Sequence, residues 1–250
     1  MKDNSRLEAY AAQQRKFWNT DDEREAKFAR VDTVSEGDEA KYQALAESTG
    51  ELLLKNIALP AQPVLLEVGC GVGRLIQQMQ KRVRFSRLHG VDISETMINY
   101  TRKNTGGDAR LNLHVNTGYD LSVVPSDSVD FAYSVDVFIH IYDADIILNY
   151  LREVHRTLKQ GGHFHFDVRF LNPDTMFGDS LGGKAAKMLY ATGLKRADTH
   201  RWQPGEPAEF NGNKYRDSDL REAVETAGLT VLSTFVRPED THLWCLARKD

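Results

Sequence analysis

The feature that most constrains the fold is a glycine-rich segment, residues 69–73, directly after a short apolar run. The run Val64–Val68 is bounded by Pro63 and Gly69 and is too short for a helix, so it is predicted to be a buried strand. Residues 74–82 then show a helical pattern. Glycines permit a tight turn and a close ligand approach, while a helix start supplies unpaired amides. The segment therefore predicts the strand–turn–helix unit of a nucleotide site.

Patterns typical of strands and helices alternate along the next part of the chain. Strands are predicted at residues 88–91, 111–115, 129–133 and 163–168, and helices at 94–103 and 144–158. Such alternation requires crossover connections between parallel strands. It indicates an α/β fold with a mostly parallel sheet that is covered by helices on both faces.

A chain of 250 residues is long enough for one large α/β domain and short for two domains of ordinary size. We therefore expect a single domain over residues 1–250. Its parts are an N-terminal helical cap (1–58), a core (64–168), an insertion without regular pattern (169–216), and a C-terminal helix with two strands (217–250).

Composition argues against several classes of protein. The formal net charge is −4 and basic residues are interspersed with acidic ones, so no patch for a nucleic acid backbone is expected. No apolar stretch has the length of a membrane span, and the N-terminus lacks the apolar centre of a signal peptide. Cys70 and Cys245 form neither a disulfide framework nor a zinc spacing. We expect a cytoplasmic protein that binds neither nucleic acid nor membrane.

The spacing of the glycines distinguishes between two classes of cofactor. A dinucleotide fingerprint has glycines at its first, third and sixth positions. Counted from Gly69, the fifth position is Gly73 and the sixth is Arg74. The spacing therefore disfavours a pyrophosphate-binding turn, and an NAD-dependent oxidoreductase remains only as an analogy of fold.

The segment Glu67-x-Gly69-x-Gly71-x-Gly73 resembles the first motif of the class I S-adenosylmethionine (SAM)-dependent methyltransferases. Further parts follow in the family's order: a strand ending at Asp92, a loop at 116–121, a strand ending at Ser134 and a turn at 158–164. This resemblance covers roughly residues 64–168. It implies an enzyme with SAM as cofactor and a Rossmann-like, seven-stranded sheet whose last strand, residues 242–247, runs antiparallel.

The resemblance also implies which residues bind the cofactor. Glu67 would lie near the ammonium of the methionine tail, Asp92 would hold the ribose hydroxyls, and Ser134 would lie near the sulfonium. Ile93 and Met97 would contact the adenine. The full implied set is Glu67, Gly69, Cys70, Gly71, Gly73, Arg74, Asp92, Ile93, Met97, Gly118, Tyr119, Asp120 and Ser134.

Two of these assignments have plain structural alternatives. Asp92 could cap the helix that begins near Ser94, and this would be the better interpretation if the glycine motif were absent. The loop 116–121, in which Asp120 or the backbone around Tyr119 would contact the adenine amino group, could be an ordinary polar turn.

His140 is the candidate catalytic base, because imidazole titrates near neutral pH and the position follows a strand at the sheet's carboxyl edge. A role in packing or in starting a helix is the alternative. His163, His165 and Asp167 alternate along one strand, but polar side chains on a strand near the sheet's end explain them without a metal. We therefore expect no metal site.

The expected reaction is methyl transfer to oxygen or nitrogen of a small-molecule acceptor. The N-terminal helices, with Tyr10, Phe17 and Trp18, and the insertion 169–216 are predicted to form the acceptor pocket, which aromatic side chains would make partly apolar. The alternatives are a methyltransferase acting on protein or RNA and a SAM-binding module without turnover.

Overall fold

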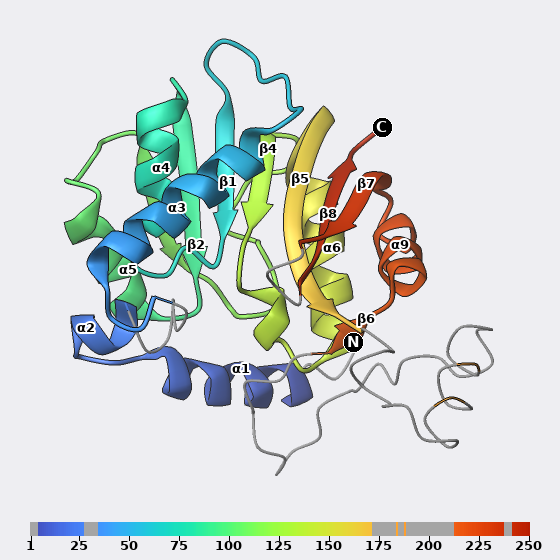
Figure 1. The fold of residues 1–250 in the computed structure, drawn as a ribbon, viewed down its shortest axis with the longest axis horizontal. Coiled ribbons are helices and arrows are strands. Elements are labelled where there is room, and N and C mark those ends of the chain that lie inside the picture. The colour runs from blue at the N-terminus through green and yellow to red at the C-terminus, as the bar shows by residue number, and fades with distance from the viewer. Residues whose placement is uncertain (1–4, 28–34, 172–183, 185–187, 189–212, 238–241) are drawn as a thin grey trace.

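The computed structural model describes residues 5–27, 35–171, 184, 188, 213–237 and 242–250 (Figure 1). Most of the insertion expected at residues 169–216 therefore lies outside the described residues. The described parts include the glycine-rich turn and the ends of the strands around it.

The described strands form one sheet in the order β3-β2-β1-β4-β5-β8-β7, with β6 beside the end of β5. β1 to β5 run parallel, whereas β8 is antiparallel to both β5 and β7. This confirms the Rossmann-like, mostly parallel sheet with an antiparallel last strand, to which β6 adds a short eighth strand. The bounds are β1 (Val64–Val68), β2 (Arg87–Asp92), β3 (Leu111–Val115), β4 (Val129–Ser134), β5 (Leu158–Phe170), β6 (Lys214–Tyr215), β7 (Thr230–Val236) and β8 (His242–Arg248).

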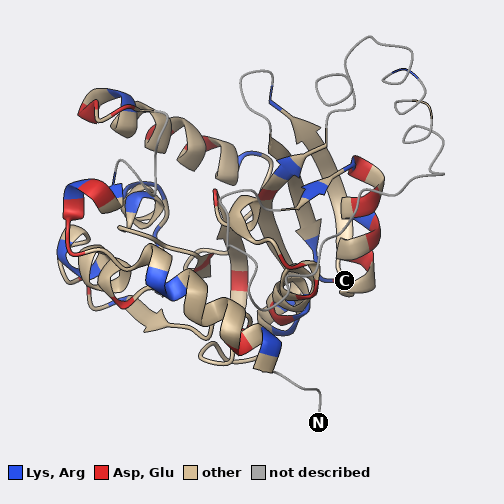
Figure 2. Ribbon diagram, turned by 90° about the horizontal axis from the view of Figure 1, so that it is seen from below, with Lys and Arg blue, Asp and Glu red and all other residues tan. Residues whose placement is uncertain are grey.

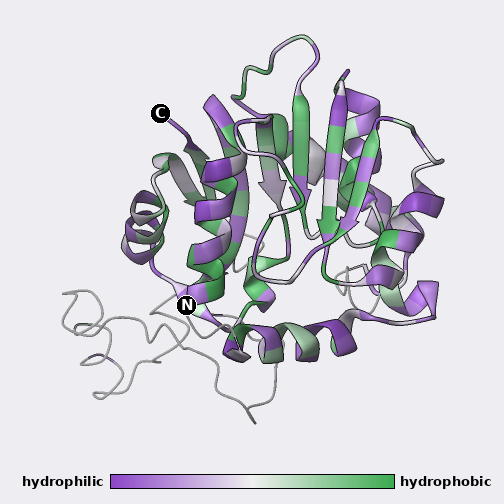
Figure 3. Ribbon diagram, turned by 180° about the vertical axis from the view of Figure 1, so that it is seen from behind, coloured by the Kyte–Doolittle hydropathy of each residue, from purple (hydrophilic) through white to green (hydrophobic). Residues whose placement is uncertain are grey.

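Helices cover both faces of the sheet, as expected, and successive strand residues point to opposite faces. On β1, Leu65 packs with side chains of α3, α4 and α5, whereas Leu66 packs with those of α6 and α9. Figure 3 shows apolar residues along the strands and mixed polarity on the helices. The helices are α1 (Ser5–Trp18), α2 (Glu23–Glu25), α3 (Glu39–Leu54), α4 (Arg74–Arg82), α5 (Glu95–Asn104), the 3-10 turn η2 (Phe138–His140), α6 (Ala144–Thr157) and α9 (Asp217–Thr226).

The helix α1 crosses the edge of the sheet at which the parallel strands end (Figures 1 and 3). Arg6 forms ion pairs with Asp143, the N-cap of α6, and with Asp145, the latter at 2.8 Å. Further along α1, Arg15 Nη1 donates a hydrogen bond of 3.0 Å to the carbonyl of Thr117. These contacts hold the N-terminal helix over the carboxyl ends of the strands, where ligands of open α/β sheets bind.

Charged residues of both signs are interspersed over the described ribbon (Figure 2). No helix in the described part of the chain combines the length and the apolar character needed to cross a membrane.

Candidate functional site

The turn after β1 needs glycine for reasons of conformation and space. Gly69, Gly71 and Gly73 have φ angles of 76°, 52° and 87°, in the left-handed region that other residues rarely adopt. A Cβ at Gly69 would also lie 2.2 Å from Cγ2 of Val137, in the segment after β4. The turn therefore brings its backbone against the end of the neighbouring strand, and a side chain at Gly69 would force the two apart.

Asp92 ends β2 and joins the glycine turn to the start of α5. Its Oδ2 accepts the N–H of Gly71 at 2.8 Å, and its Oδ1 accepts the N–H of Ser94 at 2.9 Å. The N-cap of α5 is Ser94, whose hydroxyl accepts the N–H of Met97. Burial raises the pKa of Asp92 to about 6. Asp92 therefore positions the turn without being the cap of α5, and its carboxylate retains acceptor capacity for a ligand.

Glu67 lies at the end of β1 and is buried. The hydroxyl of Tyr133, on the adjacent strand β4, donates to its Oε2 at 3.0 Å. Burial raises the pKa of Glu67 to about 8, an effect that the Tyr133 hydrogen bond and the charge of Arg74 only partly oppose. The carboxyl therefore keeps its proton at neutral pH even with the charge of Arg74 nearby, and an ammonium group bound beside it would favour its ionisation.

Arg74, the first residue of α4, is 5% exposed, and its Nη2 donates to Oδ2 of Asp136 at 3.0 Å. Asp136 follows β4 and has a φ of 60°, which is uncommon for a residue other than glycine. Its backbone N–H donates to Oδ1 of Asp167 on β5, at 3.0 Å. The turn after β1 is thus tied through Arg74 to the ends of β4 and β5.

These elements surround one pocket with about 900 Å³ of empty space, part of which is open to solvent. Of the residues expected from the sequence, those lining it are Glu67, Gly69, Cys70, Gly71, Arg74, Asp92, Ile93, Met97, Gly118 and His140.

Four expected residues do not line this pocket: Gly73, Tyr119, Asp120 and Ser134. Gly73 is the N-cap of α4, and Oδ1 of Asp120 accepts hydrogen bonds within its own loop. Ser134 is buried, and its hydroxyl donates to the carbonyl of Val68 at 2.9 Å. The geometry gives Ser134 a structural role in joining β1 to β4.

The structure adds pocket residues that the sequence analysis did not select, notably Asn116, Asp136 and Tyr150. Asn116 Nδ2 donates to the Tyr150 hydroxyl at 2.9 Å, while its Oδ1 is buried and has no hydrogen-bond partner among the described residues. The sequence did contain a signal for Asn116. It directly follows the strand predicted at 111–115, and parallel strands end at the same edge of a sheet, where ligands bind.

The outer wall of the pocket is formed by α1, which contributes Tyr10, Gln14 and Trp18. His140 at the end of η2 also lines the pocket, and its ring centroid lies 5.3 Å from that of Trp18, with an angle of 65° between the planes. The expectation that the N-terminal helices lie over the carboxyl edge thus agrees with the position of α1.

Comparison by sequence finds a domain match in the core of the chain. Residues 65–162 match the model of a methyltransferase domain. No curated protein matches the chain in sequence.

Solved structures agree with this family in fold. Geranyl diphosphate C-methyltransferase from Streptomyces coelicolor, in complex with Mg²⁺, geranyl diphosphate and S-adenosyl-L-homocysteine, is similar with a TM-score of 0.66 and 14% identity, covering 96% of this chain and 98% of that one. A putative methyltransferase in complex with the Trm112 activator of Haloferax volcanii has a TM-score of 0.60 and 19% identity, over 92% and 99%.

An S-adenosylmethionine-dependent methyltransferase from Mesorhizobium loti has a TM-score of 0.58 and 19% identity, over 82% of this chain and 100% of that one. At such identities the likeness establishes the fold, and the matching family model identifies the domain. Residues 65–162 thus match a methyltransferase domain, and the sheet has the fold of these solved methyltransferases.

Proposed function

We propose that the protein transfers the methyl group of SAM to an oxygen or nitrogen atom of a small-molecule acceptor. The observation that carries the choice of acceptor is the position of α1 across the pocket. Tyr10 and Gln14 are 1% and 9% exposed, and both line the pocket together with Trp18. A pocket walled by an anchored helix suits a small molecule better than a protein or an RNA surface.

The residues around the pocket fit the cofactor. SAM carries an ammonium, two ribose hydroxyls and an adenine amino group, and the pocket offers an acceptor for each. We assign Glu67 to the ammonium, Asp92 to the ribose hydroxyls, and the unpartnered Oδ1 of Asn116 to the adenine amino group. Asn116 thereby takes the role that the sequence analysis gave to Tyr119 or Asp120.

The glycine turn and the apolar wall complete this assignment. Gly69, Gly71 and Gly118 allow close approach of the cofactor, and Ile93 and Met97 would pack against the adenine. When bound, SAM supplies an electrophilic methyl group on a sulfonium. The protein's contribution is to hold the acceptor in line with that methyl and to exclude water.

His140 is the proposed base for acceptors that must lose a proton. Its side chain lines the pocket beside Trp18, so it can reach a molecule held there. A base is unnecessary for an acceptor that is already deprotonated, in which case His140 would act by packing alone.

The neighbouring structures and the charges bear on the alternatives. The geranyl diphosphate enzyme favours a small acceptor, although its name specifies methylation at carbon, and the Haloferax complex shows that proteins of this fold can work with a protein partner. The net charge of −4 and the interspersed charges favour neither RNA nor an anionic membrane surface. Cys70 and Cys245 are buried free thiols, which suits the proposed cytoplasmic location.

The test is methyl transfer from ¹³C-methyl SAM to a cell extract divided by ultrafiltration into small molecules and macromolecules. The proposal predicts S-adenosylhomocysteine release and ¹³C in the small-molecule fraction, with a methyl chemical shift typical of O- or N-methyl. Label on protein or RNA would favour a macromolecular acceptor. Bound SAM without any S-adenosylhomocysteine would indicate a module without turnover.

Matched variants control for contaminating enzymes. Asp92→Asn removes the carboxylate that lines the pocket, and Glu95→Gln makes the same chemical change at an exposed residue of α5. The proposal predicts that transfer is lost in the first variant and kept in the second.

A further inference from the structure

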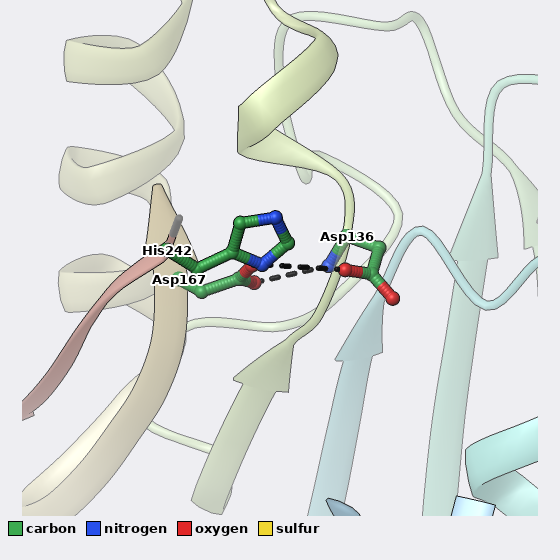
Figure 4. Close-up of side chains that lie close together, drawn as sticks. All are labelled: Asp136, Asp167 and His242. Carbon is green, nitrogen blue, oxygen red and sulfur yellow. Dashed lines mark hydrogen bonds and ion pairs between the residues drawn. The ribbon is translucent and has the colours of Figure 1, made fainter. Parts of the chain in front are cut away.

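Three polar side chains from distant parts of the sequence meet beside the pocket. Asp136 follows β4, Asp167 lies near the end of β5, and His242 begins β8. β5 pairs with β4 on one side and with β8 on the other, and the β5–β8 register places Arg169 opposite His242. Figure 4 shows the three side chains converging from these strand ends.

The distances within this cluster fit ligands of one small cation. One ligand atom from each residue lies within 4.8 Å of the others. His242 Nδ1 is 2.8 Å from Oδ2 of Asp167 and 3.6 Å from Oδ1 of Asp136. Two ligands at right angles, each about 2.1 Å from a metal ion, are separated by about 3 Å.

The state of Asp167 gives an independent reason to expect a cation. Its side chain has no exposed surface, and Oδ1 accepts the N–H of Asp136. Oδ2 is buried, and Nδ1 of His242 lies 2.8 Å from it. A buried carboxylate is costly unless a cation compensates it, and the imidazole of His242 is a cation only when it is protonated.

The net charge of the cluster is compatible with the binding of a divalent ion. Asp136 uses Oδ2 to accept from Arg74, which leaves Oδ1 on the side of His242. One of the two carboxylate charges is thus already paired with a guanidinium. A divalent cation would give the cluster a net positive charge suited to an acceptor that carries an oxygen or an anionic group.

We propose that Asp136, Asp167 and His242 bind a divalent transition-metal ion at the wall of the pocket. Two carboxylate oxygens and one imidazole nitrogen suit ions such as Mn²⁺, Fe²⁺ or Zn²⁺, and three protein ligands leave positions for water or substrate. The pattern of His163, His165 and Asp167 along β5 gave no reason to expect a metal site. The other two ligands, Asp136 and His242, lie outside β5.

The position of the cluster at the pocket suggests what the ion would do. Asp136 also lines the pocket, so a bound ion would lie at the wall of the pocket. In a step that rests on the proposed function, an acceptor hydroxyl or carboxylate bound to the ion would be fixed in place, and the pKa of a hydroxyl would be lowered.

The binding of Mn²⁺ alone tests the proposal without any substrate or SAM. The full chain is treated with EDTA, desalted and titrated with Mn²⁺, while free Mn²⁺ is followed by electron paramagnetic resonance. The proposal predicts one bound Mn²⁺ per chain and ¹⁴N coupling to the bound ion from an imidazole. Absence of binding at 1 mM Mn²⁺ would leave only an ion pair and would overturn the proposal.

Variants identify the site. Asp167→Asn and His242→Gln should each weaken Mn²⁺ binding by more than about 100-fold, since even partners of metal ligands often contribute about 10–100-fold. His114→Gln on β3, which β2, β1 and β4 separate from β5, is the matched control. If His242→Gln does not fold, Asp136→Asn can replace it in the test. Folded Asp136→Asn should bind Mn²⁺ more weakly but keep the ¹⁴N coupling, because its imidazole ligand is still present.

Two outcomes distinguish this proposal from the proposed function. Unchanged Mn²⁺ affinity in folded Asp136→Asn and Asp167→Asn would overturn the metal site, whatever the methyl transfer assay shows. Stoichiometric Mn²⁺ binding that depends on these residues would support it even if no acceptor were methylated.

Discussion

The buried carboxyl of Glu67 makes the stability of the protein depend on pH in a predictable direction. Its pKa is raised from 4.5 to about 8 by burial, so between these values the unfolded chain is ionised while the folded chain keeps the proton. The folded state then binds about one proton more, and the free energy of unfolding falls by about 1.4 kcal/mol per pH unit. The contribution is fully present below pH 4.5 and is lost as the pH rises to about 8.

The substitution Glu67→Gln removes this titration and keeps an oxygen that can accept from Tyr133. The variant should match the wild type below pH 4.5, differ from it by about 1 kcal/mol at pH 5 and become increasingly more stable above it. The gain should be on the order of 3 kcal/mol at pH 7 and on the order of 5 kcal/mol at pH 8 and above. Other titrating groups contribute to both proteins and largely cancel in the difference.

Urea unfolding followed by circular dichroism at pH 5, 6, 7 and 8 measures this difference. Glu95→Gln, an exposed residue of α5, is the control and should show a difference near zero at each pH. A difference between Glu67→Gln and the wild type that stays within about 0.5 kcal/mol from pH 5 to 8 would refute the argument, because a change of this size is typical of surface substitutions.

Other predictions follow from the same geometry. SAM binding at pH 7 should release close to one proton from Glu67, seen by calorimetry in buffers of different ionisation enthalpy; equal heats in all buffers would contradict this. Gly69→Ala, whose Cβ would meet Val137, should destabilise the protein by roughly 1–3 kcal/mol more than Gly106→Ala, which has a similar φ and nothing within 4 Å; equal losses in thermal unfolding would disprove the clash. His140→Ala should lower kcat by about 100-fold or more with little change in SAM affinity, and an unchanged kcat would rule out its role as a base.

Much of the fold could be predicted from the sequence because its local signals are strong. The run at 64–68 is short and mostly apolar, the run at 111–115 alternates apolar and polar residues, and β1 and β3 have these bounds. The helix expected at 74–82 coincides with α4, because the glycine turn fixes its start. The parallel sheet then follows from the alternation of strands and helices.

The site could be predicted only where its residues adjoin these signals. Glu67 and Asp92 end strands, so the sequence alone places them at the carboxyl edge. Asn116 was missed because the loop offered several polar residues, and only the structure shows that Asn116 faces the pocket whereas Asp120 bonds within its loop. The contribution of α1 depends on tertiary contacts such as the Arg6–Asp145 ion pair, which no local pattern encodes.

The cluster of Asp136, Asp167 and His242 could not be predicted from the sequence, for a different reason. Its formation depends on the register between β5 and β8 and on the left-handed backbone of Asp136. Register between strands far apart in the chain is set by packing and by connections, and one residue of slip would turn His242 to the other face. A pattern along β5 alone therefore could not reveal it.

Titration calorimetry of the purified protein with S-adenosylhomocysteine and with NAD tests the central claim most directly. The account predicts micromolar binding of S-adenosylhomocysteine, no binding of NAD, and a loss of affinity in Asp92→Asn that Glu95→Gln does not share. Binding of NAD alone, or equal binding of S-adenosylhomocysteine by both variants and the wild type, would contradict it.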